Sequence, residues 1–533
     1  MKKVLDQVLE VYPAKTFKNR KKHILVKSKD ELNPVIQANV RTVPGIMTNR
    51  GCCYAGCKGV VLGPVKDIVH ITHGPIGCAY YTWATRRNKA KAEDGEQNFL
   101  EYTFSTDMQE KDIVFGGVEK LKQSIKEAVD LFHPKAIGIY ATCPVGLIGD
   151  DINAVAKEAT KEYGIQVLAF NCEGYKGVSQ SAGHHIANNS ILESIVGKGK
   201  APVKQKKFSI NMLGEYNIGG DAWEIERVLE KIGYNVVGRF SGDGSYDRLE
   251  QSYAADLNLV QCHRSINYIA EMMEIKYGVP WIKINFIGVE STIETLRNMA
   301  KCFDDPGLTK RTEEVIEEEL EAISGEISFY KDKLHGKTAC LFVGGSRAHH
   351  YQKLLEDLGI KTILAGYEFG HRDDYEGREV IPNIKLDADT RNIPELTVEK
   401  DEEKYRIIIP PERYETLKEE IPFEYYGGMI KDMDEGAIVV DDLNHHETEQ
   451  FIKLLKPDMF FSGIKDKYVI QKMGVVSKQL HSYDYSGPYA GFRGAVIFAR
   501  DLAAGVFTPA WGYVTPPWRK EPLLEGQIAG GEK

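Results

Sequence analysis

The feature of this sequence that most constrains its fold is a repeated unit, in which a short apolar strand ends at a glycine-containing turn and a helix follows. Units of this kind are predicted over residues 136–146, 208–221, 257–277, 281–292 and 338–350. Alternating strands and helices are typical of mainly parallel sheets covered by helices. Because 533 residues are too many for one hydrophobic core, the sequence predicts an α/β fold of three open, doubly wound domains.

The expected domain boundaries follow the rhythm of these units. One segment, residues 378–424, breaks that rhythm: it is highly charged and contains several prolines. It is predicted to be a surface insertion with a short helix over Pro411–Glu420, and a loop of this length is usually functional. The expected ranges are 1–200 for the first domain, with the C-terminal segment 490–533 packed on its surface, 201–335 for the second and 336–489 for the third.

Charge and hydropathy argue against several classes of protein. The formal net charge is -9 and no block of lysine and arginine stands out, which gives no support to nucleic-acid binding. No apolar run approaches the roughly 20 residues that span a bilayer, and the N-terminal segment carries charges within its apolar part, unlike a secretory signal. No glycine turn matches a nucleotide-binding motif. We therefore expect a cytoplasmic protein that contacts neither nucleic acid nor membrane.

Three of the nine cysteines share an unusual setting. Cys52, Cys78 and Cys143 each lie in a turn rich in glycine or proline, and the last two follow apolar strands directly. Any one of them alone could be a turn cysteine without a role. Three such turns together favour thiolates that converge on one iron–sulfur cluster, since cysteine thiolates hold these clusters. No C-x-x-C pair is present, which argues against a structural zinc site.

A fourth cysteine, Cys262, lies between an apolar strand ending near Val260 and a predicted helix over Ile266–Tyr277. This places the thiol at the carboxyl edge of a sheet, where ligands bind in α/β proteins. The helix-start amides and Arg264 beside it favour the thiolate. The thiolate could be a nucleophile or a metal ligand, and a partly buried free cysteine with no role is the bland alternative.

Several long motifs, in order between about Arg50 and about Trp518, resemble the α subunits of nitrogenase component 1, the molybdenum–iron protein. They include H-G-P-I-G-C at 73–78, L-N-L-V-Q-C-H-R-S-I-N-Y at 257–268 and H-S-Y-D-Y-S-G-P-Y at 481–489. The resemblance implies an oxidoreductase that reduces N2 to ammonia, consumes protons and evolves H2. It also implies an α2β2 tetramer with a β chain, and electrons delivered by a separate ATP-hydrolysing iron protein.

The resemblance also implies two metal clusters and their ligands. Cys52, Cys78 and Cys143 become this subunit's ligands to an [8Fe–7S] P-cluster, which the β chain completes. Cys262 becomes the thiolate on the terminal iron of the iron–molybdenum cofactor, [7Fe–Mo–9S–C] with homocitrate. His481 becomes the imidazole on the molybdenum at its opposite end, and the cofactor is expected in the crevice between domains.

Further positions match residues that surround the cofactor in this family. His184 matches a histidine that donates a hydrogen bond to a cofactor sulfur and relays protons, and Val60 matches a small apolar residue over the reactive iron face. Gln180 and Lys465 match residues in contact with homocitrate. The remaining matches are Arg86 and Arg347, the arginines flanking the cofactor; Gly344 and Gly345, whose amides face sulfurs; and Ser265 and Tyr216, which lie near it.

The chain departs from the family pattern at a few positions. Cys53 and Cys57 stand where alanine and serine are common, Ser346 where leucine is common, and His263 where tyrosine is usual. The 378–424 insertion resembles the long form found in clostridial relatives, and we hypothesise that it alters docking of the iron protein.

Three alternatives remain open at this point. A vanadium or iron-only nitrogenase would share the cysteine and histidine ligands, although the loop at 344–347 favours molybdenum. A non-catalytic scaffold that assembles the cofactor would lack the molybdenum-side histidine, so His481 speaks against it. A relative of the dark-operative chlorophyllide reductases would lack the pair of Cys262 and His481.

Overall fold

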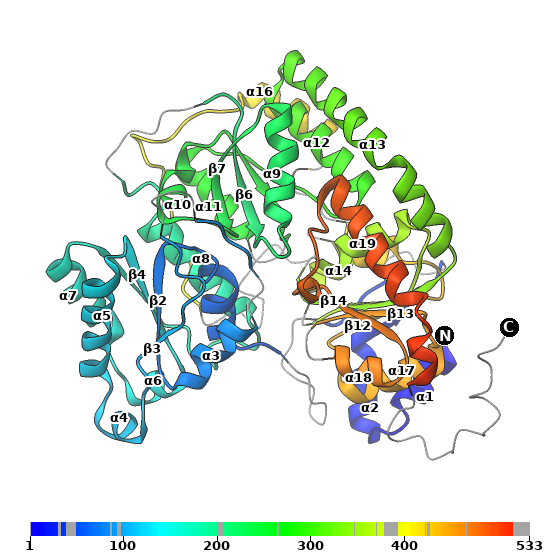
Figure 1. Cartoon of the computed structure of the whole chain (residues 1–533), viewed down its shortest axis with the longest axis horizontal. Coiled ribbons are helices and arrows are strands. Elements are labelled where there is room, and N and C mark those ends of the chain that lie inside the picture. The colour runs from blue at the N-terminus through cyan, green and yellow to red at the C-terminus, as the bar shows by residue number, and fades with distance from the viewer. Residues whose placement is uncertain are drawn as a thin grey trace.

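The computed structural model describes most of the chain. The described residues are 2–29, 34–38, 50–85, 88–92, 97–199, 206–263, 266–345, 347–368, 370–377, 393–421, 423, 427–463 and 466–514. Three sheets, each with its own helices, form three units that meet at the centre of the molecule (Figure 1). All strand pairs within these sheets are parallel except one, which confirms the predicted α/β class.

The first unit is built on a four-stranded parallel sheet of order β3-β2-β4-β5. Strands β2 and β4 are buried along their whole length, as expected for a parallel sheet covered on both faces. Its strands are β2 (Ile68–His73), β3 (Phe104–Ser105), β4 (Ala136–Ala141) and β5 (Gln166–Phe170). Its helices are the π-helix η2 (Ala55–Leu62), α3 (Ile76–Ala84), α4 (Glu110–Phe115), α5 (Val118–Phe132), α6 (Cys143–Ile148), α7 (Ile152–Tyr163) and α8 (Ser181–Ser194).

The second unit has the sheet order β7-β6-β8-β9. The predicted strand before Cys262 and the helix after it are confirmed, as β8 and α11. Its strands are β6 (Ser209–Glu215), β7 (Asn235–Ser241), β8 (Leu257–Val260) and β9 (Trp281–Lys283). Its helices are α9 (Asp221–Ile232), α10 (Tyr246–Gln251), α11 (Asn267–Tyr277), α12 (Val289–Phe303) and α13 (Pro306–Leu334).

The third unit is a six-stranded sheet of order β1-β12-β11-β10-β13-β14, in which only β1 is antiparallel to its neighbour. Its strands are β1 (Ile24–Val26), β10 (Thr338–Phe342), β11 (Lys361–Tyr367), β12 (Ile438–Asp441), β13 (Met459–Ser462) and β14 (Val476–Gln479). The remaining helices are α1 (Lys2–Leu9), α2 (Ala14–Arg20), α14 (Arg347–Asp357), α15 (Arg372–Glu376), α16 (Pro411–Glu420), α17 (His445–Leu455), α18 (Lys467–Lys472) and α19 (Gly491–Val506).

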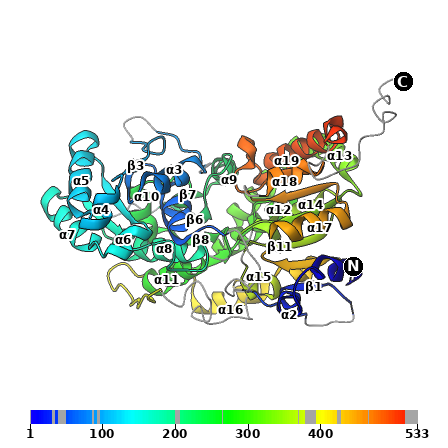
Figure 2. The ribbon, with the colours of Figure 1, turned by 90° about the horizontal axis from the view of Figure 1, so that it is seen from below.

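Two hydrophobic cores cross the boundaries between units, while the first and third units each also have a core of their own. One buried cluster joins side chains of the second unit, such as Leu259, to side chains of the third, such as Leu341 and Tyr483. Helix α19 extends this shared core, because it packs on α9, α12 and α13 (Figures 1 and 2). The predicted domain boundaries stay a prediction. Two elements that were assigned to the first domain lie elsewhere: β1 joins the third sheet, and α19 packs on helices of the second unit.

The helix predicted within the insertion is confirmed as α16, with the same bounds. Residues 378–392, 422 and 424 of the insertion lie outside the described part of the chain. Its described part lies along the second unit, where the Arg406 amide donates to Tyr277 O at 3.0 Å and the Arg406 guanidinium pairs with Asp256 at 3.0 Å. Gly278 permits this approach, because a Cβ at this position would overlap with the Arg406 carbonyl oxygen.

Within the described residues, none of the helices combines the length and the apolar character that crossing a lipid bilayer requires.

A buried ion pair ties α2 to the third unit and yields a stability prediction. The Arg20 guanidinium is bidentate to Glu447 at 2.7 Å and also donates to Asp441 O at 2.7 Å. Because Arg20→Met would leave the buried Glu447 carboxylate without its partner, we expect a loss of about 3–5 kcal/mol of unfolding free energy. The control is Lys21→Met, whose exposed pair with Asp6 is worth at most about 1 kcal/mol. Urea unfolding measures both, and equal effects would contradict this assignment.

Two candidate metal centres

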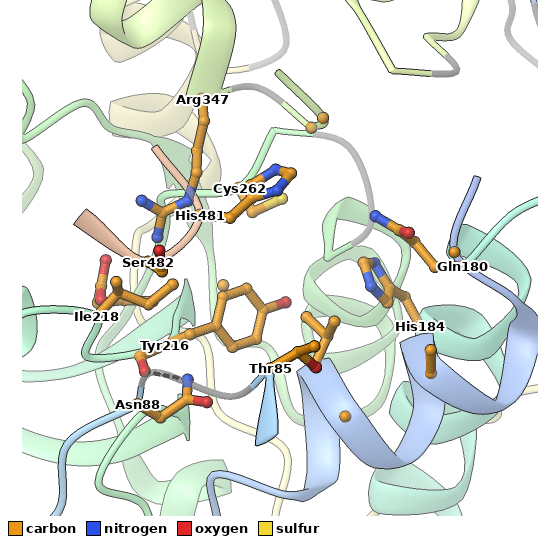
Figure 3. Close-up of a pocket in the computed structure, with 18 of the residues that line it drawn as sticks. Thr85, Asn88, Gln180, His184, Tyr216, Ile218, Cys262, Arg347, His481 and Ser482 are labelled. Atoms are coloured by element: carbon orange, nitrogen blue, oxygen red, sulfur yellow. Dashed lines mark hydrogen bonds between the residues drawn. The ribbon is translucent and has the colours of Figure 1, made fainter. Parts of the chain in front are cut away.

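A cavity of about 230 Å³ lies where the three units meet (Figure 3). Nine of the residues predicted from the sequence line this one cavity, although they come from distant parts of the chain. The first unit contributes Val60, Gln180 and His184; the second contributes Tyr216 and Cys262; the third contributes Gly344, Gly345, Arg347 and His481. The predicted site residues Arg86, Ser265 and Lys465 lie outside the described residues and stay predictions.

The Cys262 thiol sits just beyond β8, at the carboxyl edge of the second sheet, and is half-buried. Its position requires glycine at Gly214, which has φ +77°, because a Cβ there would lie 2.6 Å from the Cys262 Cβ. On its other side, a Cβ at Gly345 would lie 3.9 Å from the Cys262 sulfur. The thiol is therefore bordered by backbone that carries no side chain, which leaves room for a bulky group.

The His481 imidazole follows β14 in the third unit and is also bordered by glycines. A Cβ at Gly344 would lie 3.5 Å from Nε2, and a Cβ at Gly463 would lie 3.3 Å from Nδ1. The adjacent glycines Gly344 and Gly345 thus border the imidazole and the thiol respectively. The structure brings a soft sulfur ligand and an imidazole to one cavity, and this donor set fits an iron–sulfur cluster that contains a second metal.

Among the described residues that line this cavity, Arg347 is the only lysine or arginine. It donates to the Tyr483 hydroxyl at 2.6 Å and lies 5.5 Å from the centre of the same ring. Burial opposes its charge, but Tyr483 and then Glu215 outweigh burial and raise the pKa of Arg347 above its ordinary value. Arg347 therefore stays charged, and a fixed, partly buried cation favours a ligand with net negative charge.

Glu215 is a lining residue that the sequence analysis missed. It is the last residue of β6, it is buried, and its carboxylate accepts a hydrogen bond from the Asn217 amide at 2.6 Å. Burial and then the nearby Asp221 carboxylate raise the pKa of Glu215 to about 7. The group can therefore hold or release a proton near neutral pH. The one signal in the sequence was an acidic residue at the end of an apolar strand.

A second missed carboxylate, Glu368, lies beside His481. The same Cβ built at Gly344 or Gly463 would lie within 3.7 Å of the Glu368 Oε2 and within 3.5 Å of the imidazole. Carboxylates in this position commonly orient a metal-binding histidine and fix its tautomer. Glu368 follows β11, so only the order of strands in the folded sheet brings it to His481.

The first unit closes the cavity with the π-helix η2, which carries Val60, and with α8, which carries His184. The two helices pack closely because of glycines: a Cβ at Gly56 would overlap with the Gln180 carbonyl oxygen, and one at Gly183 with the Cys53 carbonyl oxygen. Figure 3 shows His184 and Gln180 on the side of the cavity opposite Arg347. Asn88 holds the adjacent loop by donating to Tyr216 O at 2.6 Å.

The second candidate centre consists of Cys52, Cys78 and Cys143 in the first unit. Cys78 lies in the first turn of α3 and Cys143 is the first residue of α6, and Gly174 brings Cys143 and Cys52 together. A Cβ at Gly174 would lie 2.9 Å from the Cys143 sulfur and 3.7 Å from the Cys52 sulfur. Burial, followed by Cys52 and Cys143, raises the pKa of Cys78, and a bound metal would favour its thiolate.

These thiols open onto the surface of the chain, where Cys52 and Cys143 are exposed. Several large apolar side chains on the same or neighbouring elements are also exposed to solvent. Leu147 on α6 is 77% exposed, and Phe115 on the neighbouring α4 is 88% exposed; Ile76 and Tyr175 are also exposed. An exposed apolar patch of this kind marks an interaction surface, so the thiols lie where another chain can cover them.

Comparison with known proteins identifies the class. Residues 52–507 match the family described as nitrogenase component 1 type oxidoreductase, and the chain belongs to this family. It is 64% identical over 529 residues to the nitrogenase molybdenum-iron protein alpha chain of Clostridium pasteurianum, covering 99% of each chain. It is 55% identical over 521 residues to the protein of the same name from Methanosarcina barkeri, covering 97% of each.

A solved structure agrees with these sequence comparisons. The structure titled nitrogenase Cp1 at pH 6.5 is similar to this chain with a TM-score of 0.93 and 65% identity, over 97% of this chain and all of that one. The resemblance inferred from the sequence motifs is confirmed.

Proposed function

We propose that this chain is the catalytic α subunit of a molybdenum nitrogenase, which reduces N2 to ammonia and evolves H2. It works in an α2β2 tetramer with a β chain and receives electrons from an ATP-hydrolysing iron protein. The observation that carries this proposal is the cavity at the meeting point of three units, in which the Cys262 thiol and the His481 imidazole flank Gly344 and Gly345 beside the partly buried Arg347 cation.

The fit of the residues supports two clusters. Cys262 and His481 would hold the iron–molybdenum cofactor, with its homocitrate, at its two ends. When bound, this cofactor supplies the multi-electron chemistry of N2 reduction, while the protein supplies position, protons and electrostatics. Cys52, Cys78 and Cys143 would hold the [8Fe–7S] P-cluster together with the β chain, which fits their place on an exposed apolar surface.

The other lining residues have roles that follow from their chemistry. Arg347 balances negative charge in the cavity, and the bare amides of Gly344 and Gly345 can donate to sulfur acceptors. Glu215 and His184 can hold protons close to the bound substrate. The apolar side chain of Val60 restricts access of substrates to the cavity. Gln180, which directly precedes α8, contributes a side-chain amide to the lining of the cavity.

The two relatives named above do not support a vanadium or iron-only enzyme, or an assembly scaffold. Both carry the name nitrogenase molybdenum-iron protein alpha chain. We further propose a cytoplasmic location, because the iron protein must hydrolyse ATP where ATP is supplied. The effect of the 378–424 insertion on docking of that protein stays a hypothesis.

Metal analysis of the protein purified without oxygen, together with its β chain, tests the proposed function. We expect one molybdenum atom for each copy of this chain, with many iron atoms, and reduction of N2 when the iron protein and ATP are added. Vanadium in place of molybdenum, or iron alone, would overturn the proposal. Metal without N2 reduction would favour the assembly scaffold.

A further inference from the structure

The carboxylate of Asp221 is a buried charge that none of the roles above uses. It is the first residue of α9 in the second unit and is 0% exposed. Among the described residues, the donors to this carboxylate all lie in the segment that follows His481. The Tyr483 hydroxyl donates to Oδ2 at 2.5 Å, while the Tyr489 and Ala490 amides donate to Oδ1 at 2.7 and 3.0 Å.

The segment that donates these hydrogen bonds to Asp221 has a strained backbone. Tyr483, Asp484 and Tyr485 have φ of 52°, 52° and 66°, the left-handed region that residues other than glycine rarely adopt. Three such residues in succession persist only when their surroundings hold them there. The backbone of the second unit also approaches closely, because a Cβ at Gly219 would lie 2.7 Å from the Ser486 carbonyl oxygen.

Tyr483 also connects Asp221 to the cavity. Its hydroxyl accepts a hydrogen bond from the Arg347 guanidinium at 2.6 Å and donates one to the Asp221 carboxylate at 2.5 Å. Hydrogen bonds to charged groups are stronger than neutral ones, so the three groups form one ordered row. Burial raises the pKa of Asp221, and Arg347 and the three donors act in the opposite direction.

We propose that Asp221 is a positioning residue: it holds the 481–490 loop against the second unit and so fixes His481 relative to Cys262, and through Tyr483 it fixes Arg347. The two candidate cofactor ligands lie in different units, so their separation depends on contacts between those units. Asp221 supplies such a contact a few residues beyond His481. The inference rests on the proposed function, since it assigns Asp221 to the placement of cofactor ligands.

The experiment compares two hydroxyl deletions in the assembled, anaerobically purified holoenzyme. Tyr483→Phe removes the link between Asp221 and Arg347 but keeps the ring, whose centre lies 4.3 Å from the centre of the Tyr489 ring at an interplanar angle of 36°. The matched control is Tyr489→Phe, because the Tyr489 hydroxyl donates at 2.7 Å to Asp501 and not to Asp221. We expect Tyr483→Phe to shift the electron paramagnetic resonance signal of the bound cofactor and Tyr489→Phe to leave it unchanged.

A second variant, Asp221→Asn, keeps an oxygen acceptor for the two amides but removes the charge. We expect a several-fold loss of molybdenum while the iron of the three-thiol centre is retained. If this variant does not fold, the comparison of Tyr483→Phe with Tyr489→Phe decides alone. Identical resonance signals and molybdenum contents in those two variants would overturn the inference. Wild-type protein without molybdenum would instead overturn the proposed function.

Discussion

A Cys262→Ala variant is expected to purify with its three-thiol centre intact but without molybdenum. Cys262 is one of two protein side chains proposed to bind the cofactor, and Gly214 and Gly345, which border it, carry no side chain that could replace the sulfur. Changing an outer partner of a metal ligand typically costs about 10–100-fold in metal affinity, so loss of the ligand itself should exceed that range. Reduction of N2 should be lost with the cofactor.

The control for this experiment is Cys302→Ala. Cys302 is a buried thiol on α12, in the core shared by the second and third units, and it does not line the central cavity. This variant should keep its molybdenum. Metal analysis of both variants checks the prediction, and molybdenum at the wild-type level in Cys262→Ala would contradict the ligand assignment.

The second large effect is expected for Cys143→Ala. Its sulfur is exposed and meets Cys52 across Gly174, on the apolar surface proposed to face the β chain. Removing it should release the iron of the shared cluster and weaken assembly of the tetramer, because the cluster would bind both chains. Iron analysis and sedimentation of the complex measure the two effects.

Cys340→Ala provides the comparison for that variant. Cys340 is buried in the middle of β10, in a core of the third unit. Burial raises its pKa, and it should bind no metal. Iron content and tetramer fraction equal to those of this control would show that Cys143 is not a ligand of a shared cluster.

Much of the fold was predictable because the relevant signals are local. The apolar strand before Cys262, the helix after it and the helix over Pro411–Glu420 follow from the order of residues within each segment. The π-helix η2 was not predicted, since its shape depends on α8, which packs against it across Gly56 and Gly183. The place of β1 in the third sheet depends in the same way on pairing with β12, which lies more than 400 residues further along the chain.

The same distinction between local and long-range signals applies to the residues of the candidate site. Family motifs predicted Cys262 and His481, and the structure places both at one cavity. Glu215, Glu368 and Asp221 carried no comparable signal, because an acidic residue becomes distinctive only when other units bury it. Asp221, for example, is an ordinary first residue of a helix until Tyr483 and the backbone of Tyr489 and Ala490 enclose it.

Anomalous diffraction from the intact tetramer at the molybdenum absorption edge tests the assignment of the central cavity most directly. We predict one strong molybdenum peak for each copy of this chain, next to the His481 imidazole, with iron density continuing from it to the Cys262 sulfur. A molybdenum peak elsewhere in the protein, or a cavity without metal density between these two side chains, would contradict it.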